Sequence, residues 1–305
     1  MHTLRQGNEV RGNAPNVANR EIDRTAMNAL LVGLLKSLEY LGEQRHEILD
    51  KVESAMLKYL VETGNIASSG APGKSGRSLT RLLANNGYGS THPRHLPLGS
   101  RPSLNLIETM AHSARRPKSP PYPKRRISEE KDKVDWVLYE AVLYGMTRAL
   151  DDQLGVQGQV ILDRIGSSML DYLISLGAIK RSDDPNILIQ RVIDYFVKAG
   201  YAKSFRFELE GAPPDTFVSR YESARYYTNV FRRTQKEGSA LLACPLCLIG
   251  HSIWATEGWR FGDVFEVRIS SGGNVLAKAR IYPEGERFTA KDALTFSQIE
   301  VRPPS

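Results

Sequence analysis

The stretch ILDKVESAMLKYLVETGNI, residues 48–66, recurs without a gap as ILDRIGSSMLDYLISLGAI, residues 161–179. Ten of the 19 aligned positions are identical, and the offset between the two copies is 113 residues. Similarity at a fixed internal offset is the signature of a duplicated structural unit. Because the match continues upstream with one residue inserted, the sequence predicts a duplicated unit of roughly 45 residues.

Each copy shows the apolar spacing of an α-helix. In the first copy the apolar positions, at i, i+4, i+8, i+11 and i+12, are Ile48, Val52, Met56, Tyr59 and Leu60. This spacing places them on one face of a helix. Gly64 and Gly177 follow where a left-handed residue commonly ends a helix. We therefore predict an αα-hairpin in each copy, with turns at Leu41–Gly42 and Leu154–Gly155.

The packing of these hairpins decides the fold class. A hairpin this small cannot bury its apolar face alone, so we expect the copies to pack against each other as a pseudo-symmetric four-helix arrangement. The alternatives are packing elsewhere in the chain, or against a second chain in a homodimer. The predicted fold class is α+β: a helical bundle of duplicated hairpins, followed by a C-terminal α+β domain with a small antiparallel sheet.

Composition and pattern divide the chain into six segments. The predicted segments are a flexible N-terminus (1–24), a first helical hairpin (25–66), a disordered basic linker (67–133), a second helical hairpin (134–179), an α+β ligand-binding-like domain (180–283) and a C-terminal extension (284–305). Within the α+β domain we predict a helix over 185–200, a strand over 204–211, a helix or a strand-to-helix passage over 216–237, an apolar helix over 240–257 and a hairpin over 263–283.

The segment 67–133 concentrates the positive charge of the chain. It holds 13 Lys and Arg against 4 Asp and Glu, with 8 of the 16 prolines. This composition favours disorder, with short helices at 77–86 and 103–112 as candidate exceptions. Clustered cations suit nucleic acid or an acidic partner. The residues predicted to bind such a partner are Arg115, Arg116, Lys118, Lys124, Arg125 and Arg126.

The only two cysteines, Cys244 and Cys247, form one CxxC. So few cysteines exclude a disulfide-stapled secreted scaffold and fit a reducing compartment, so we expect a cytoplasmic protein. The uncharged run 239–256 is 18 residues long, but Pro245 and several polar residues interrupt it. We therefore expect a buried core helix and no transmembrane span.

Three interpretations of the cysteines compete. With His251 they form C-x2-C-x3-H, which could supply three ligands to zinc, although structural zinc normally takes four. A CxxC at a helix start, with Pro245 in the first turn, would lower a thiol pKa and favour redox chemistry. Both cysteines could also simply be small apolar core residues. Aromatic residues nearby predict a pocket for an apolar ligand, lined by Leu246, Ile249, Trp254, Trp259 and Tyr226.

From Val134 to Pro283 the order of features resembles the 4-vinyl-reductase-like small-molecule-binding domain family. The residues that carry the resemblance are VLYEAVLYGMTRALDDQLG, IQRVIDYFVKAGYAKSFRFELEG and ACPLCLIGHSIWATEGWRFGDVFEVRISSGGNVLAKARIYP. The resemblance covers about half of the chain and implies a hydrophobic or signalling ligand and dimerisation through helices. The family often carries another cysteine in the last hairpin, and its absence here argues against a family-type metal site but not against an apolar pocket.

The sequence lacks the motifs of several enzyme classes. There is no GxxxxGK[ST], no GxGxxG after a strand, no HExxH and no GxSxG. We expect a non-enzymatic binding or adaptor protein, whose C-terminal domain binds an apolar small molecule or a protein partner. The alternatives are an interaction protein that acts through its basic linker, and a thiol oxidoreductase with Cys244 as nucleophile.

Overall fold

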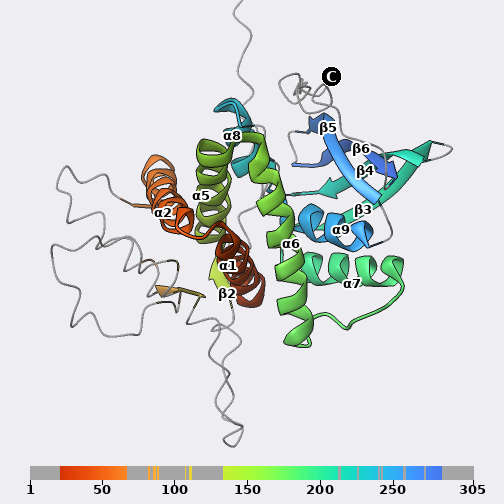
Figure 1. Ribbon diagram of the computed structural model, residues 1–305, viewed down its shortest axis with the longest axis horizontal. Helices are drawn as coiled ribbons and strands as arrows, with labels where there is room; N and C mark the ends of the chain where they lie inside the picture. Colours follow the sequence, from red (N-terminus) through yellow and green to blue (C-terminus); the bar gives the residue numbers. More distant parts are fainter. Residues whose placement is uncertain are drawn as a thin grey trace, which may run out of the picture.

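The structure is a computed structural model of the chain (Figure 1). It describes residues 21–66, 82, 85, 86, 88, 107, 110, 111, 133–211, 214–224, 227–239, 241, 243–256, 259–270 and 273–283. The predictions made for residues 1–20, for most of 67–132 and for 284–305 lie outside the described residues.

Four long helices make up the helical part: α1 (Arg24–Leu38), α2 (Gln44–Glu62), α5 (Trp136–Leu154) and α6 (Gly158–Ser175). The most extensive helix–helix contacts join α1 to α6 and α2 to α5 (Figure 1). The predicted four-helix arrangement is confirmed, but the two helices of one copy make few contacts with each other. The two helices of a copy are therefore joined by a turn but do not pack along each other. Each helix instead buries its apolar face on a helix of the other copy.

A short antiparallel pair of strands starts both copies. Strand β1 (Glu21–Asp23) pairs with β2 (Lys133–Asp135), and Ile22 lies opposite Val134. Asp23 and Asp135 then cap α1 and α5, because each carboxylate accepts a backbone N–H two residues later, at 2.6 and 2.9 Å. The repeat thus begins earlier than the sequence comparison indicated, and residues 21–24 belong to the folded part rather than to the predicted flexible N-terminus.

Two equivalent glycines allow the helices of different copies to approach closely. A Cβ at Gly33 of α1 would lie 2.9 Å from the carbonyl oxygen of Ile165, and one at Gly145 of α5 would lie 2.6 Å from that of Val52. Gly33 and Gly145 are 112 residues apart, and Val52 and Ile165 are 113 apart. The same close contact is therefore made twice, once at each side of the pseudo-symmetric arrangement.

The predicted helix ends are confirmed. Gly64 and Gly177 have φ angles of +74° and +70°, which a residue with a side chain rarely adopts. The N–H groups that follow fold back on the last turn, with Asn65 donating to Leu60 at 2.9 Å and Ala178 donating to Leu173 at 3.0 Å. The two second helices therefore end in the same way.

Part of the segment predicted to be a disordered linker belongs to the core. Ile107, Met110 and Ala111 are helical and fully buried, and the N–H of Ile107 donates to the carboxylate of Glu53 on α2 at 3.1 Å. Tyr88 is also buried. The helix named as a candidate at 103–112 is therefore present at these three residues, and Ile107 is fixed by its hydrogen bond to Glu53.

Among its described residues, the C-terminal unit has three helices and one antiparallel sheet. Helix α7 (Pro185–Lys198) precedes β3 (Ser204–Gly211) and β4 (Pro214–Glu222); a π-helical turn (Tyr227–Phe231) leads into α8 (Arg232–Lys236); α9 (Pro245–Ala255) precedes β5 (Trp259–Ile269) and β6 (Val275–Pro283). The strand order is β3-β4-β6-β5. The predicted helix at 185–200, the strand at 204–211 and the C-terminal hairpin are confirmed, while the predicted apolar helix begins later, at Pro245.

Helix α9 lies at the centre of the molecule. It packs on α6 and α7 on one side and contacts β5 of the sheet on the other (Figure 1). On the α6 side the contact is very close, since a Cβ at Gly166 would lie 2.4 Å from the carbonyl group of Leu248. With only 11 residues α9 is short, and no helix in the described parts of the chain is long and apolar enough to cross a membrane.

Candidate thiol site

Both cysteines lie at the N-terminal end of α9. Cys244 is the residue that caps the helix, and its Sγ accepts the backbone N–H of Cys247 at 3.4 Å. Pro245 occupies the first turn, where its missing N–H costs no hydrogen bond. Cys244 is completely buried and Cys247 is 4% exposed. The structure therefore confirms the prediction that the CxxC lies at the start of a helix.

Two tyrosine hydroxyl groups surround the sulfur atoms. The Oη of Tyr221, on β4, lies 3.1 Å from the Sγ of Cys244 and 2.7 Å from the Sγ of Cys247. The hydroxyl of Tyr201 donates to the Sγ of Cys244 at 3.4 Å. The sheet, helix α9 and the segment that follows α7 thus each supply a polar group to one small, buried site.

These contacts favour the thiolate form of Cys244. Burial alone would raise the pKa of Cys244, but hydrogen bonds from the Cys247 thiol, Tyr201, Tyr221 and the Cys247 backbone N–H outweigh it and lower the pKa to about 7. Cys244 also stands at the positive end of a helix dipole, which acts in the same direction. The surroundings of Cys244 therefore favour its thiolate more than those of an ordinary cysteine.

A third tyrosine hydroxyl lies close by without a partner. Tyr139 on α5 is fully buried, and its hydroxyl makes no hydrogen bond within the described residues. Burial, together with the nearby charge of Cys244, raises its pKa far above the usual range. An unsatisfied buried hydroxyl is rare, and this one belongs to the wall of the thiol site.

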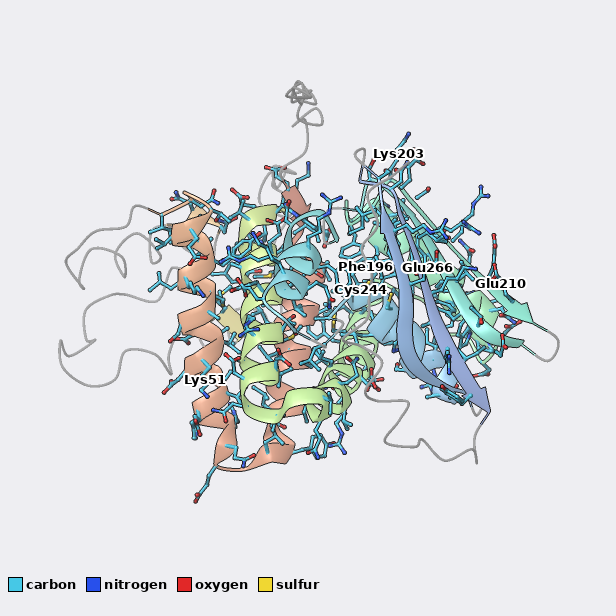
Figure 2. All side chains as sticks on the ribbon, turned by 90° about the horizontal axis from the view of Figure 1, so that it is seen from above. Lys51, Phe196, Lys203, Glu210, Cys244 and Glu266 are labelled. Atoms are coloured by element: carbon cyan, nitrogen blue, oxygen red, sulfur yellow. The ribbon has the colours of Figure 1, made fainter. Side chains whose placement is uncertain are left out.

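Aromatic rings enclose the site on the helical side. Trp136 stacks on Tyr139 with ring centres 5.2 Å apart and meets Tyr201 edge-on at 5.9 Å. Phe196 of α7 also meets Tyr201 edge-on, at 5.8 Å. Figure 2 shows Cys244 and Phe196 in the interior, between the four long helices and the sheet. The thiols are therefore held in a low-dielectric environment that strengthens their hydrogen bonds.

The sequence analysis did not identify these tyrosines. Tyr201 follows Gly200, whose φ of +91° ends α7 and turns the chain inward. Tyr221 shares one face of β4 with Phe217 and Ser219, and all three are buried, as is Val218 on the opposite face. The sequence around Tyr221 therefore shows no clean apolar alternation, and strand spacing does not show which helix a side chain meets.

His251 does not join the two cysteines. Its Nδ1 lies 3.5 Å from a carboxylate oxygen of Asp163 on α6, and its side chain is 14% exposed. No three His, Cys, Asp or Glu side chains of the described residues lie close enough together to hold a metal ion. The predicted zinc site of Cys244, Cys247 and His251 is therefore not assembled, because the imidazole of His251 turns to Asp163 of α6 instead of to the thiols.

The residues predicted to line an apolar pocket are placed differently from one another. Leu246 and Ile249 are buried in the core of the molecule. Trp254 is partly buried and packs edge-on against Phe217 of β4, at 5.0 Å, with Phe207 of β3 at 5.2 Å. The side chain of Trp259 and the whole of Tyr226 lie outside the described residues, as do the six linker cations from Arg115 to Arg126.

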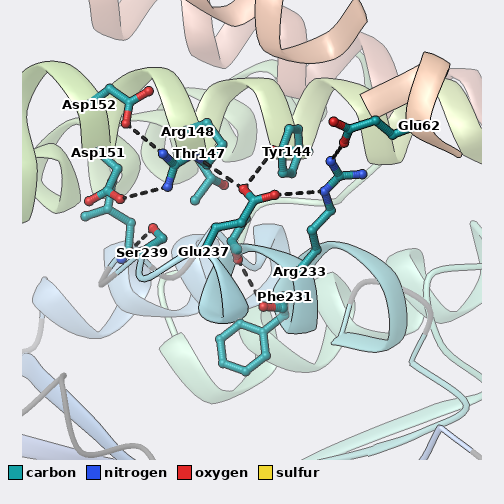
Figure 3. A network of polar contacts seen from close by, with 12 residues as sticks. Glu62, Tyr144, Thr147, Arg148, Asp151, Asp152, Phe231, Arg233, Glu237 and Ser239 are labelled. Carbon is teal, nitrogen blue, oxygen red and sulfur yellow. Dashed lines mark hydrogen bonds and ion pairs between the residues drawn. The ribbon is translucent and has the colours of Figure 1, made fainter. Parts of the chain in front are cut away.

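A polar network fixes α8 to the helical part (Figure 3). Arg233 forms ion pairs with Glu62 of α2 and with Glu237, the latter at 3.1 Å. Glu237 in turn accepts the hydroxyl of Tyr144 at 2.7 Å and lies 3.7 Å from Arg148. Because each charge has an opposite partner, this network holds the C-terminal unit in place and offers no reactive group.

Comparison with known proteins adds no relative: no family model, no curated protein and no solved structure matches the chain.

Proposed function

We propose that this chain is a non-enzymatic binding or adaptor protein whose C-terminal unit responds to thiol oxidation at Cys244 and Cys247. The observation that carries the proposal is the Cys244 sulfur, which caps α9 and receives hydrogen bonds from Tyr201 and Cys247. Reactive cysteines in proteins combine a stabilised thiolate, often at a helix start, with partial exposure; Cys244 has the first two features and needs local opening for the third.

Complete burial supports a sensor over an oxidoreductase. An enzyme that exchanges disulfides with protein substrates must bring its nucleophile to a bulky partner. Cys244 has no exposed surface, so only a small oxidant can reach it through local opening of the structure. Hydrogen peroxide is an oxidant of suitable size.

The proposed reaction uses both thiols. The Cys244 thiolate attacks one oxygen of hydrogen peroxide, the O–O bond breaks, and hydroxide leaves as Cys244 becomes a sulfenic acid. The Cys247 sulfur then attacks the Cys244 sulfur, the S–S bond forms, and water leaves after the Cys247 proton is transferred. The two thiols lose two electrons and two protons, and the peroxide is reduced to two water molecules.

Oxidation would change the contacts of α9. In the disulfide, Cys244 no longer carries the negative charge that Tyr201 and Tyr221 stabilise. Two buried hydroxyl groups would lose their best acceptor, which costs about 1–3 kcal/mol for each group left unsatisfied. We expect β4 and the start of α9 to loosen, and this change in the C-terminal unit to alter its affinity for a partner.

Mass spectrometry of the full chain tests the proposal. The protein is treated with hydrogen peroxide near pH 7, quenched with acid, alkylated and then measured with and without prior reduction by dithiothreitol. We expect the wild-type chain to lose two hydrogen atoms and to regain them on reduction. Hydrogen exchange on the same samples is expected to be faster in α9 and β4 after oxidation.

Two variants serve as controls. Cys247→Ser retains the attacking sulfur and is expected to stop at the sulfenic acid, while Cys244→Ser is expected to resist peroxide. A wild-type chain that forms no disulfide while folded, or a Cys244→Ser chain that reacts as fast as wild type, would contradict the proposal.

A second candidate function is the binding of an apolar small molecule. The aromatic cluster of Trp254, Phe207 and Phe217 supports it, because Trp254 retains an exposed edge at the junction of α9 and the sheet. Native mass spectrometry of freshly purified protein is expected to show a discrete apolar adduct that Trp254→Ala weakens without unfolding the chain. A bare wild-type chain would count against this function, which also rests on the family resemblance.

A further inference from the structure

A cleft of about 490 Å³ opens at the other side of α7, away from the cysteines. It is lined by Asp23, Ala178, Ile179, Lys180, Arg191, Asp194, Tyr195, Lys198 and Ala199. Its size falls within the range of roughly 300–1,000 Å³ that is usual for small-molecule sites. The cleft joins both copies of the repeat to the C-terminal unit, since Asp23 starts the first copy, Ala178 and Ile179 end the second, and the remaining lining residues follow in the C-terminal unit.

The helix α7 supplies one wall through residues that share a face. Arg191, Asp194, Tyr195 and Lys198 follow at i, i+3, i+4 and i+7, the spacing that aligns side chains along a helix. The opposite wall is the turn after α6, and Arg191 fixes that turn by donating to the carbonyl oxygens of Lys180 and Arg181 at 2.9 and 2.8 Å. The walls are thereby held at a defined separation.

The two acidic groups of the cleft already have hydrogen-bond donors. Asp23 accepts the N–H of Thr25 at 2.6 Å and the hydroxyl of Tyr195 at 3.3 Å, and its charge also lies at the positive end of α1. Asp194 accepts the side-chain amide of Gln190 at 2.8 Å. Neither carboxylate pairs with a cation of the cleft among the described residues.

The cations of the cleft, in contrast, form no ion pair with the carboxylates or with any other described residue. The side-chain ammonium groups of Lys180 and Lys198 are exposed and form no hydrogen bond or ion pair with any described residue. The guanidinium of Arg191 contacts carbonyl oxygens only. Three cations and two carboxylates therefore line one cleft, and this excess of positive charge attracts negatively charged ligands.

We propose that this cleft binds a small organic polyanion, held by Lys180, Lys198 and the free edge of Arg191. The shared chemistry is a compact ligand with two or more negative oxygens, supplied either by carboxylates or by phosphate groups. Tyr195 and Ile179 would cover its uncharged part. The proposal is independent of the thiol chemistry, because it uses none of the residues of that site.

Calorimetric titration of the full chain at constant ionic strength tests the site. The probes are citrate, which carries carboxylates, and inorganic pyrophosphate, which carries phosphates, each up to about 10 mM, a range that includes weak binding. The variant Lys180→Gln/Lys198→Gln removes both free ammonium groups. We expect it to weaken binding of the preferred probe by about fivefold to tenfold, the effect of two partly exposed charge-assisted contacts.

A charge-matched variant provides the control. Lys36→Gln/Lys236→Gln removes the same net charge at exposed positions that do not line the cleft, and it should bind the probe within about twofold of wild type. The preferred probe assigns the ligand as a carboxylate or a phosphate. No binding of either probe to wild type, or an equal loss in both double variants, would overturn the proposal.

Discussion

The two copies of the repeat differ at one pair of equivalent positions, Glu53 on α2 and Gly166 on α6. Each position contacts a helical residue from another part of the chain: Ile107 in the first copy and Leu248 of α9 in the second. Glu53 meets it with a carboxylate, which accepts the N–H of Ile107. Gly166 meets it with no side chain at all, so the backbone of Leu248 comes into direct contact.

This difference explains why the thiol site lies beside the second copy. The close contact at Gly166 brings α9 into the core, and Cys244 at its start then reaches Tyr201 and Tyr221. The tyrosine equivalent to Tyr201 in the first copy is Tyr88, at an offset of 113, and its hydroxyl donates to Asn28 at 2.9 Å. The same framework thus positions a thiol in one copy and an amide in the other.

The largest expected effect is that of Gly166→Ala. The new Cβ would lie 2.4 Å from the backbone of Leu248, so α9 must move. We expect a loss of about 3 kcal/mol in the free energy of unfolding, at the upper end for an overpacked core. Denaturant unfolding measures it, and peroxide-driven disulfide formation at Cys244 should change with it.

Gly250→Ala is the matched control for that variant. Gly250 also lies in a helix and is buried, but a Cβ there would meet no described atom within 4 Å. Because Ala favours a helix over Gly by about 1 kcal/mol, we expect unchanged or increased stability. An equal loss of unfolding free energy in both variants would show that the close contact between α6 and α9 at Gly166 does not set the stability.

The next effect concerns pH. The pKa of Cys244 is lower in the folded chain than in the unfolded chain, so its contribution to stability is fully present above the unfolded value of about 9 and is lost as pH falls through about 7. We expect the stability difference between wild type and Cys244→Ser to grow by about 2 kcal/mol from pH 6 to pH 9. Denaturant unfolding across this range measures it, and a flat difference would argue against a stabilised thiolate.

A smaller effect is expected in the first copy. Glu53→Ala leaves the buried N–H of Ile107 without its carboxylate, which costs about 1–2 kcal/mol. The exposed Glu43 at the start of α2 makes no side-chain cap, so Glu43→Ala should change stability by less than about 0.5 kcal/mol. If Glu53→Ala were equally neutral, the linker residue Ile107 would not be anchored on α2.

Features that depend on neighbouring residues were predicted from the sequence, whereas contacts between residues far apart in the chain were not. Gly64 and Gly177 were predictable because a helix end depends on neighbouring residues, and β3 because alternation is local. The exchange of helices between copies was not, since apolar spacing shows that a face is buried but does not identify what covers it. The tyrosines of the thiol site lie 23 and 43 residues from Cys244, and no local pattern links them to it.

The most direct test of the thiol site is a titration of thiolate absorbance in the intact chain, since this signal does not require a reagent to reach the buried sulfur. The account predicts a thiolate step near pH 7 in wild type that is absent in Cys244→Ser. A first step near pH 9, the ordinary value for a thiol, would contradict the stabilised Cys244 thiolate and with it the proposed response to oxidation.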